Sequence, residues 1–444
     1  MPPKLPTPKK NKNEDTVLVW LVYSYIVLLV FEGALRKWIL PGLSDLLLLV
    51  RDPIVLISYA WAIIHGRPLL NNYILSAALL ITVCTGTALL FGHGNLVVTA
   101  FGIRTNFLHF PFAFIIGRVL TRDLVIDVGR WWLWCSVGMT ILVVSQYLMP
   151  QSAWVNRSVG GGEGAGFSGA LGRYRPPATF SFIIGTVQFY TLSMAFLIAG
   201  LIQHKRYTKK LLLLSAAAIL VAIPVSISRS LILSCAIVVA AGLFTGGMQK
   251  GSMIRFLRLG LIGMIALFIA TKIPVFDDAL EAFSARWERS TGADQGGFKE
   301  AIVGRFFEMF TGPFKDIEDL PIFGYGLGAG TQIGTKLLSG ERGFSLGESE
   351  WNRVFGEYGF ILGLLFIIWR VSLCAKLLQL SIKTLAKGNG IPLILLSTTA
   401  INLVTGQLGQ TTVNGFTVVG VGLVIASMRP RNPETVEENS ANGT

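Results

Sequence analysis

The sequence has few charged residues. Asp, Glu, Lys and Arg make up 14% of its 444 residues, against about 25% in a typical soluble domain. Hydrophobic residues make up 52%, and the mean hydropathy is +0.60. Apolar runs of about 17 to 25 residues, long enough to cross the hydrocarbon core of a bilayer, recur along the chain. This composition excludes an ordinary soluble enzyme and predicts an all-α polytopic membrane protein.

Cysteine and histidine are also scarce. Because the four cysteines lie in or beside apolar runs and none forms a CxxC, we expect neither a disulfide framework nor a thiolate metal site. All four histidines precede residue 205 and none falls in a long hydrophilic segment, which excludes a histidine zinc site or a histidine general base there. The acids Asp316, Glu318 and Asp319 lack ligand-like spacing. We therefore expect no metal and no cofactor.

Hydropathy predicts about twelve transmembrane helices. The 42–64 span contains Arg51, Asp52 and Pro53. Since an unpaired charge at the bilayer centre costs roughly 2.5–3.5 kcal/mol, we expect this span to be broken or re-entrant and its Arg51 and Asp52 to pair with each other. The expected spans are residues 17–34, 42–64, 73–91, 98–117, 131–149, 178–202, 211–227, 230–247, 255–275, 356–378, 390–407 and 411–428.

The short loops differ in their content of Lys and Arg, which predicts the orientation. One side carries most of the basic residues, and by the positive-inside rule this side and both polar tails, 1–16 and 429–444, are cytoplasmic. The other side carries few, chiefly Arg36, Lys37 and Arg104. The group assigned to the cytoplasm comprises Lys4, Lys9, Lys10, Lys12, Arg118, Arg122, Arg130, Lys205, Arg206, Lys209, Lys210, Lys250, Arg255, Arg258, Arg370, Lys376, Lys383 and Lys387.

Two segments on the outer side are too long to be simple connections between the helical blocks 17–149, 178–275 and 356–428. Residues 150–177 are rich in glycine, and residues 276–355 contain amphipathic stretches such as DDALEAFSARWERS and GGFKEAIVGRFFEMF. Loops beyond about 15 residues are uncommon unless they are functional or disordered. The aromatic content of the second segment argues against disorder, so we expect a large helical loop and the chemistry on this side.

Arginines mark the outer side as a place for anions. Arg173 and Arg175 precede Pro-Pro and a new span, and lipid headgroup contact is the alternative to a specific anion site. Arg229 lies near the outer end of a span between two serines, where an arginine must be paired, exposed at the interface or directed to a polar cavity. Arg305 precedes PIFGYGLGAG, whose alternating glycines predict a tight turn that brings backbone N–H groups close to another group. Tyr325 lies in this turn and is a candidate substrate contact.

The combination of these features resembles the bacterial O-antigen ligase/polymerase family, over roughly residues 173 to 363. The ligase branch carries His, then Asn, Ser or Gln, nine residues, Gly, three residues, and Gly, Thr or Tyr. Here Ser349, Gly359 and Gly363 match this spacing, but Glu348 stands at the histidine position. Arg229 and Arg305 fall where the family keeps functional arginines. The missing histidine favours the polymerase branch.

The resemblance implies a GT-C-like fold in the bacterial inner membrane and a site that faces the periplasm. It implies transfer of a glycan carried by undecaprenyl pyrophosphate onto a second lipid-linked repeat unit. Arg229, Arg305 and one of Arg173 and Arg175 then stabilise the leaving pyrophosphate, and Glu348 is the general base. A solvated carboxylate is the alternative for Glu348.

Further candidates follow Glu348 in the sequence. Glu350 and Glu357 are alternative bases, and a helix from residue 350 places Glu350 and Arg353 on one face as possible substrate contacts. The expected partners are the lipid-linked oligosaccharide, membrane lipids, a chain-length regulator and a flippase, and not nucleic acid. An O-antigen ligase and a polysaccharide transporter or flippase remain the alternative functions.

Overall fold

A computed structural model describes residues 12–67, 70–164, 166–203, 206–248, 274–291, 304, 308, 310–314, 320–340 and 349–429. Its longer helices are α1 (Lys12–Ala34), α3 (Asp52–Ile64), α4 (Asn72–Leu90), α6 (Phe110–Val119), α7 (Arg122–Leu148), α8 (Ile183–Ile202), α9 (Lys209–Val225), α10 (Arg229–Gly247), α12 (Pro274–Thr291), α16 (Glu350–Ala386), α17 (Ile391–Thr405) and α18 (Thr411–Ser427). The shorter elements are η1 (Leu35–Ile39), η2 (Pro41–Leu43), α2 (Ser44–Leu47), α5 (Leu96–Ile103), η3 (Arg104–Leu108), η4 (Trp154–Asn156), β1 (Phe167–Ser168), β2 (Tyr174–Arg175), η8 (Gly312–Phe314) and α15 (Gln332–Ser339).

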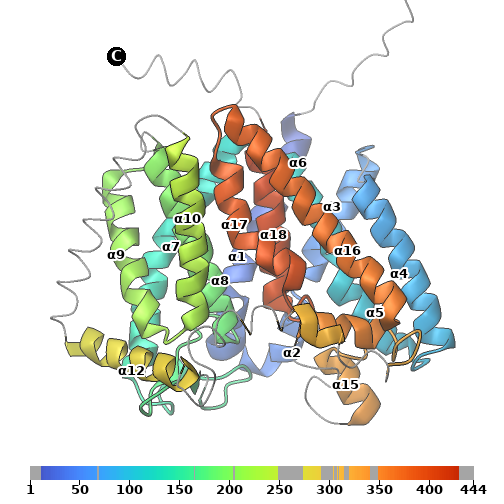
Figure 1. Ribbon diagram of the computed structural model, residues 1–444, viewed down its shortest axis with the longest axis horizontal. Helices are drawn as coiled ribbons and strands as arrows, with labels where there is room; N and C mark the ends of the chain where they lie inside the picture. Colours follow the sequence, from blue (N-terminus) through green and yellow to red (C-terminus); the bar gives the residue numbers. More distant parts are fainter. Residues whose placement is uncertain are drawn as a thin grey trace, which may run out of the picture.

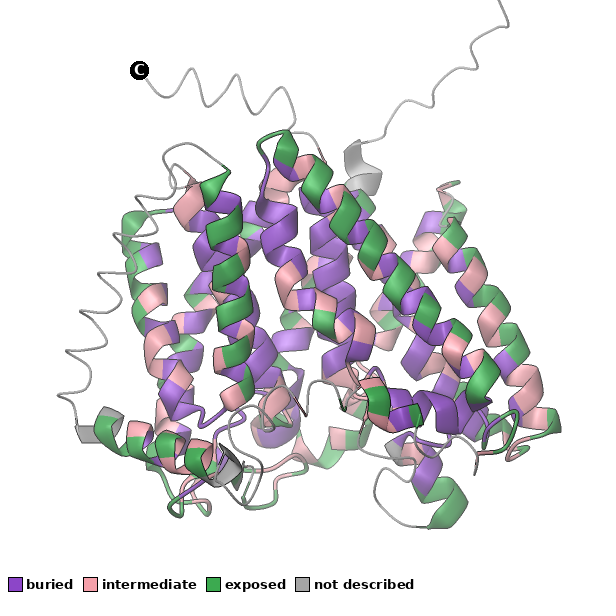
Figure 2. Ribbon diagram, viewed as in Figure 1, coloured by how far each residue is buried: buried purple, intermediate pink, exposed green. Residues whose placement is uncertain are grey.

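The described helices form one bundle in which most axes run in a common direction (Figure 1). Seven of them are long and apolar enough to cross a membrane. In the most apolar window of α8, 83% of the residues are buried, against 22% in the windows of Pro41–Ile64 and of α4. Figure 2 shows the same gradient, with buried residues concentrated in the inner helices and exposed residues on the outer faces. The chain is therefore a multi-pass, all-helical membrane protein whose outer helix surfaces are apolar.

Glycines let the inner helices approach closely. A Cβ added to Gly117 of α6 would lie 2.5 Å from Ile425 of α18, and one added to Gly422 of α18 would lie 2.5 Å from Ile116. Small residues at helix contacts are typical of membrane bundles, because backbone packing there replaces the hydrophobic effect. This contact fixes α18 in the centre of the bundle.

The seven candidate spans coincide with seven of the twelve that hydropathy predicts. The predicted span 98–117 is divided into α5, the π-helical turn η3 and α6, while α9, α17 and α18 have only 17, 15 and 17 residues. The predicted span 255–275 lies mostly outside the described residues. The total of twelve therefore stays a prediction.

The predicted break in the 42–64 span is present, but its predicted ion pair is wrong. Between α2 and α3, at residues 48–51, the α-helical hydrogen bonding is replaced by turns that bond three residues back. Arg51 Nε binds Glu32 Oε2 at 2.9 Å, whereas Asp52 Oδ1 accepts from Arg104 Nη2 at 3.1 Å and contacts His109 Nε2 at 2.9 Å. Neighbouring residues on a helical turn point in different directions, so Arg51 and Asp52 find separate partners.

One end of the bundle carries the long connections, and we call it the loop face (the lower end in Figure 1). It comprises residues 149–182, α12 and residues 320–340. The predicted helix in DDALEAFSARWERS is confirmed as α12. Residues 150–177 are not purely irregular, because β1 and β2 pair as a two-stranded antiparallel hairpin. The hairpin brings Arg175 to the base of α8.

Candidate functional site

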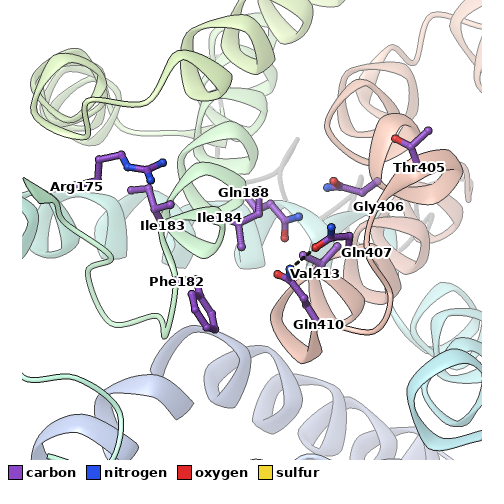
Figure 3. A pocket seen from close by; sticks show the side chains of 11 residues that line it. Arg175, Phe182, Ile183, Ile184, Gln188, Thr405, Gly406, Gln407, Gln410 and Val413 are labelled. Atoms are coloured by element: carbon purple, nitrogen blue, oxygen red, sulfur yellow. Dashed lines mark hydrogen bonds between the residues drawn. The ribbon is translucent and has the colours of Figure 1, made fainter. Parts of the chain in front are cut away.

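A cavity of about 470 Å³ lies at the loop-face end of α8, α17 and α18. Arg175 and Phe182 form one side, and residues 402–410 form the other (Figure 3). Its remaining lining is Ile183, Ile184, Gln188 and Val413. Binding sites for small molecules typically measure about 300–1,000 Å³, with apolar walls and a few placed polar groups. The size and lining of this cavity fit that description.

Of the predicted arginines, Arg175 lines this cavity and Arg229 acts electrostatically on Arg175. Arg175 lines it from β2, and Arg229 is the first residue of α10, which packs against both α8 and α17. Burial lowers the pKa of the Arg175 guanidinium, and the nearby positive charge of Arg229 lowers it further. A guanidinium group can bind an anion through two parallel N–H groups, so Arg175 is the candidate anion contact of the cavity.

The backbone is strained close to three of the predicted arginines, Arg173, Arg175 and Arg229. Among the described residues, the non-glycine residues with positive φ are Leu171, Ala178 and Ile227, at +51°, +53° and +46°. They lie two residues before Arg173, three after Arg175 and two before Arg229. Each such conformation costs on the order of 1–3 kcal/mol and persists where surrounding contacts impose it. Their concentration beside these arginines indicates that arginine placement is under structural constraint.

Buried polar side chains impose one of these conformations. Gln146 binds both backbone groups of Ala178, accepting from its N–H at 2.8 Å and donating to its carbonyl at 3.2 Å. Lys37 Nζ donates to the same carbonyl at 3.1 Å, and the Lys37 side chain is fully buried. These contacts hold the segment between Arg175 and α8. No sequence pattern indicated Gln146, and Lys37, which was counted among the basic residues of the outer side, is buried.

Arg173 points to a different neighbour from Arg175. Its Nη2 atom binds Asp278 Oδ2 of α12 at 3.2 Å, and its guanidinium lies 5.0 Å from the centre of the Tyr147 ring. Both partners of the ion pair are partly exposed. Arg173 therefore attaches the hairpin to α12, and it does not line the cavity.

The predicted glycine turn packs on the predicted glycine-spaced helix. The N–H of Tyr325 donates to Gly356 O at 2.7 Å, and the N–H of Gly326 donates to Glu357 O at 3.1 Å. The Gly330 N–H donates to Glu357 Oε1 at 3.1 Å. The turn thus brings N–H groups to α16, as predicted. The side chain of Tyr325 is 45% exposed and lies outside the cavity lining.

Four charged side chains of α16 form a buried cluster that we call the charge quartet: Glu350, Arg353, Glu357 and Arg370. Arg353 pairs with Glu350 and with Glu357, each at 2.9 Å, and Arg370 pairs with Glu350 at 2.6 Å. All four are at least 96% buried. The predicted contact between Glu350 and Arg353 is present, but neither residue reaches the cavity. Two acids and two bases leave the quartet without net charge.

The charge quartet holds the loop that joins α17 to α18. Arg370 donates to Leu403 O and Gly406 O, each at 2.7 Å, where α17 ends. A cation at a helix C-terminus is favourable because the last carbonyls lack partners within the helix. Glu350 Oε1 accepts from the Leu408 N–H at 3.3 Å. The opposite side of this loop lines the cavity, so the quartet positions a cavity wall.

A second buried network holds the start of α18. Arg51, which pairs with Glu32, also donates from Nη2 to Thr411 O at 2.8 Å. Asn414 donates to Thr105 O and, at 3.4 Å, to Leu408 O. The sequence indicated that Arg51 would be paired but did not indicate this loop as its target.

The candidate residues therefore divide into three groups. Arg175 lines the cavity and is influenced by the charge of Arg229, while Arg173, Tyr325, Glu350 and Arg353 have other surroundings. Arg305 and Glu348 lie outside the described residues. Within the part of the chain that the structure describes, no three His, Cys, Asp or Glu side chains form a group that could hold a metal ion. The cavity residues Gln188, Gln407 and Gln410 were not predicted.

Comparison of the chain with protein-family models, curated proteins and solved structures finds no significant match. The structure itself defines the class: a multi-pass helical membrane protein with a cavity at one end of the bundle, lined by Arg175, several amides and apolar side chains.

Proposed function

We propose that this protein is a glycosyltransferase of the O-antigen ligase/polymerase type that joins lipid-linked glycan repeat units. It has a GT-C-like fold with twelve crossings of the bacterial inner membrane. Both termini are cytoplasmic, and the loop face is periplasmic. The donor is a glycan on undecaprenyl pyrophosphate, and a second lipid-linked repeat unit is the acceptor. A flippase supplies the substrate, and a chain-length regulator is a further partner.

The observation that supports this proposal is the guanidinium of Arg175 in the cavity lining, with the charge of Arg229 acting on it from the start of α10. A pyrophosphate gains negative charge as its bond to the sugar breaks. Preorganised positive groups directed at developing charge usually give the largest catalytic contribution. Guanidinium groups also bind phosphate oxygens in a bidentate geometry that lysine does not offer. In this role the arginines replace the divalent cation that many glycosyltransferases use.

The reaction needs a base as well as an anion site. An acceptor hydroxyl oxygen attacks the anomeric carbon, the bond from that carbon to the pyrophosphate oxygen breaks, and the pyrophosphate leaves with the electron pair. The hydroxyl proton passes to a carboxylate. We assign this carboxylate to Glu348 and a further pyrophosphate contact to Arg305. Glu350 and Glu357 suit the base less well, because ion pairs in the charge quartet already hold both.

Transport of the same lipid-linked glycan is the second candidate function. It is favoured by charges buried within the first two candidate spans, where Glu32 pairs with Arg51. Intramembrane charges often line transport pathways. Arg51 also holds the cavity loop through Thr411, however, so the polymerase proposal accounts for this pair as a positioning element.

The test is to incubate the purified protein with lipid-linked repeat units and separate the products on a gel. We expect a ladder from the unmodified protein. A product formed only with an added lipid A acceptor would identify a ligase, and an unchanged substrate that crosses a vesicle membrane would identify a transporter. Either result contradicts the polymerase proposal.

Arginine variants test the roles within the site. We expect Arg175→Ala and Arg229→Ala to abolish the ladder, and the Lys variants to impair it because the planar fork is lost. Arg157→Ala is the matched control, since Arg157 lies exposed in the same loop. Arg173→Ala should retain activity. A full ladder from Arg229→Ala would contradict the proposal.

A further inference from the structure

Gln188 is a buried polar side chain without a hydrogen-bond partner. It lies in the second turn of α8, lines the cavity and is only 6% exposed. Neither its amide nitrogen nor its amide oxygen is bonded to another protein group. An unpaired buried polar atom costs about 1–3 kcal/mol. Such a residue points to a bound group that supplies both an acceptor and a donor.

Further amides line the cavity opposite Gln188 (Figure 3). Gln407 and Gln410 lie in the loop between α17 and α18, and the amide of Gln410 donates to the side-chain oxygen of Gln407. Asn402 belongs to the same wall. Phe182 and Val413 provide apolar surface between the two sides. The cavity therefore combines uncharged donors and acceptors with an aromatic wall.

The two buried networks keep the amide wall in place. Arg370 binds the backbone just before Gln407, at Gly406 O, and Arg51 binds the backbone just after Gln410, at Thr411 O. A site held within a narrow range of geometry binds with less loss of conformational entropy. The wall is thus preorganised for a ligand of fixed shape.

We propose that this cavity is a subsite for a neutral sugar ring, in which Gln188, Gln407 and Gln410 bind hydroxyl groups and Phe182 packs on the apolar face of the ring. The inference rests on the proposed function and adds the part of the substrate that the cavity receives. Amides suit hydroxyls because each group is both donor and acceptor. The pyrophosphate binds at Arg175 and Arg229, at the side of the cavity, and the first sugars of the glycan extend toward Gln188.

Other occupants fit the lining less well. An isoprenoid chain would leave the buried amides unpaired, since it has no polar atoms. A second phosphate would require cationic lining, and Arg175 is the single Lys or Arg among the described lining residues. Water can hydrogen-bond to the amides but makes no favourable contact with the apolar ring of Phe182. A sugar ring uses both kinds of surface.

The experiment is saturation-transfer NMR on the purified full-length protein in nanodiscs. The probes are a panel of neutral gluco-, galacto-, manno- and N-acetylhexosamine disaccharides, and inorganic pyrophosphate is titrated separately. The test variant is Gln188→Met, which keeps the length of the side chain and removes the amide. Gln379→Met is the matched control, because Gln379 is exposed on the outer face of α16. Arg229→Ala is a second comparison.

We expect at least one disaccharide to give a signal, and we expect Gln188→Met to weaken that signal about tenfold. A change of this size corresponds to the loss of one to two hydrogen bonds. Gln379→Met and Arg229→Ala should keep the signal, and Gln188→Met should keep pyrophosphate binding. A melting temperature of Gln188→Met at or above that of the unmodified protein would exclude misfolding as the cause.

Each other outcome has a distinct meaning. If pyrophosphate binds but no disaccharide does, or if Gln188→Met binds sugar normally, the sugar subsite is wrong and the proposed function stands. If disaccharides bind and pyrophosphate does not, the subsite stands and the proposed donor is wrong. If neither probe binds, the cavity holds only water and both are overturned.

Discussion

At the scale of single residues, the predicted and the observed surroundings differ most for the basic side chains. Arg370 was assigned to the cytoplasmic group of positive charges, and this is wrong, because it is fully buried and binds the loop-face end of α17. Arg36 and Lys37 were counted as outer loop residues, yet both are buried. The positive-inside rule counts charges on loops, so a buried arginine misleads it. The exposed Lys376, Lys383 and Lys387 still support the predicted orientation.

The charge quartet leads to a prediction about stability. Arg370→Met leaves Glu350 short of one partner and frees the carbonyls at the end of α17, so we expect the free energy of unfolding to fall by about 3–5 kcal/mol. Adding Glu350→Gln removes the excess negative charge and leaves the neutral Arg353–Glu357 pair. The double variant should therefore be destabilised by less than the sum of the two single variants. Thermal unfolding in detergent measures all three, and simple additivity would exclude the pairing as the cause.

Sequence patterns identified the candidate arginines but not the residues that hold the cavity wall in place. Arg175 and Arg229 stood out because arginines at the ends of membrane spans need an explanation. Gln188 did not stand out, because a single glutamine in an apolar helix can have many structural roles. The fold is needed to show that its amide lacks a hydrogen-bond partner. Gln146 and Arg51 act on Ala178 and Thr411, which are 32 and 360 residues away. Such contacts depend on tertiary structure and leave no local pattern.

At the scale of elements, two glycine patterns that were predicted separately prove to be one contact. Gly324 and Gly359 both have positive φ, at +68° and +72°, and their backbones touch. Gly359 interrupts α16, so that residues 350–358 turn away from the long segment that follows. The family spacing identified Gly359, and the structure shows that Gly359 contacts the turn at residues 321–324. The spacing located the residue but not its neighbour, because a sequence pattern does not show which segment packs on a glycine.

A substitution at Gly359 tests this contact. A Cβ there would lie 2.0 Å from Ile322 O, in a backbone conformation that L-residues avoid. We expect Gly359→Ala to lower the free energy of unfolding by more than the roughly 1–3 kcal/mol that this sparsely populated conformation (φ +72°, ψ 176°) costs alone. Gly138→Ala in α7 is the control, because no atom lies within 4 Å of its added Cβ. This variant should be neutral or up to about 1 kcal/mol more stable, as helical alanine is favoured over glycine. Equal melting temperatures for the two variants would contradict the assigned role of Gly359.

At the scale of the whole molecule, the buried charge networks and the exposed lysines of α16 lie in different parts of the bundle. The charge quartet and the Arg51–Glu32 pair hold the loop that forms the cavity wall near the loop face, while Lys383 and Lys387 are exposed toward the opposite end of α16. Hydropathy predicted the all-helical class from the apolar runs, because burial in lipid demands them. Hydropathy did not predict that α5 and α6 are separate short helices. A break between two helices needs no polar residues when other buried groups hydrogen-bond to its backbone. Orientation depends on exposed residues at both ends and can be measured directly.

Cysteine labelling of intact cells tests that orientation. Cys84, Cys135, Cys235 and Cys374 are free thiols, two of them buried and two half-buried, so their replacement by alanine gives an unreactive background. Into it we introduce either Glu163→Cys, exposed on the loop face, or Lys387→Cys, exposed where α16 ends at the other side of the bundle (Figure 1). A membrane-impermeant maleimide should label position 163 in intact cells, and position 387 only after the inner membrane is opened. Labelling of both positions in intact cells would mean that they share one side, and the reverse pattern would place the cavity in the cytoplasm. In that case the substrate would have to be a cytoplasmic activated sugar, since a periplasmic lipid-linked glycan could not reach Arg175 and Arg229.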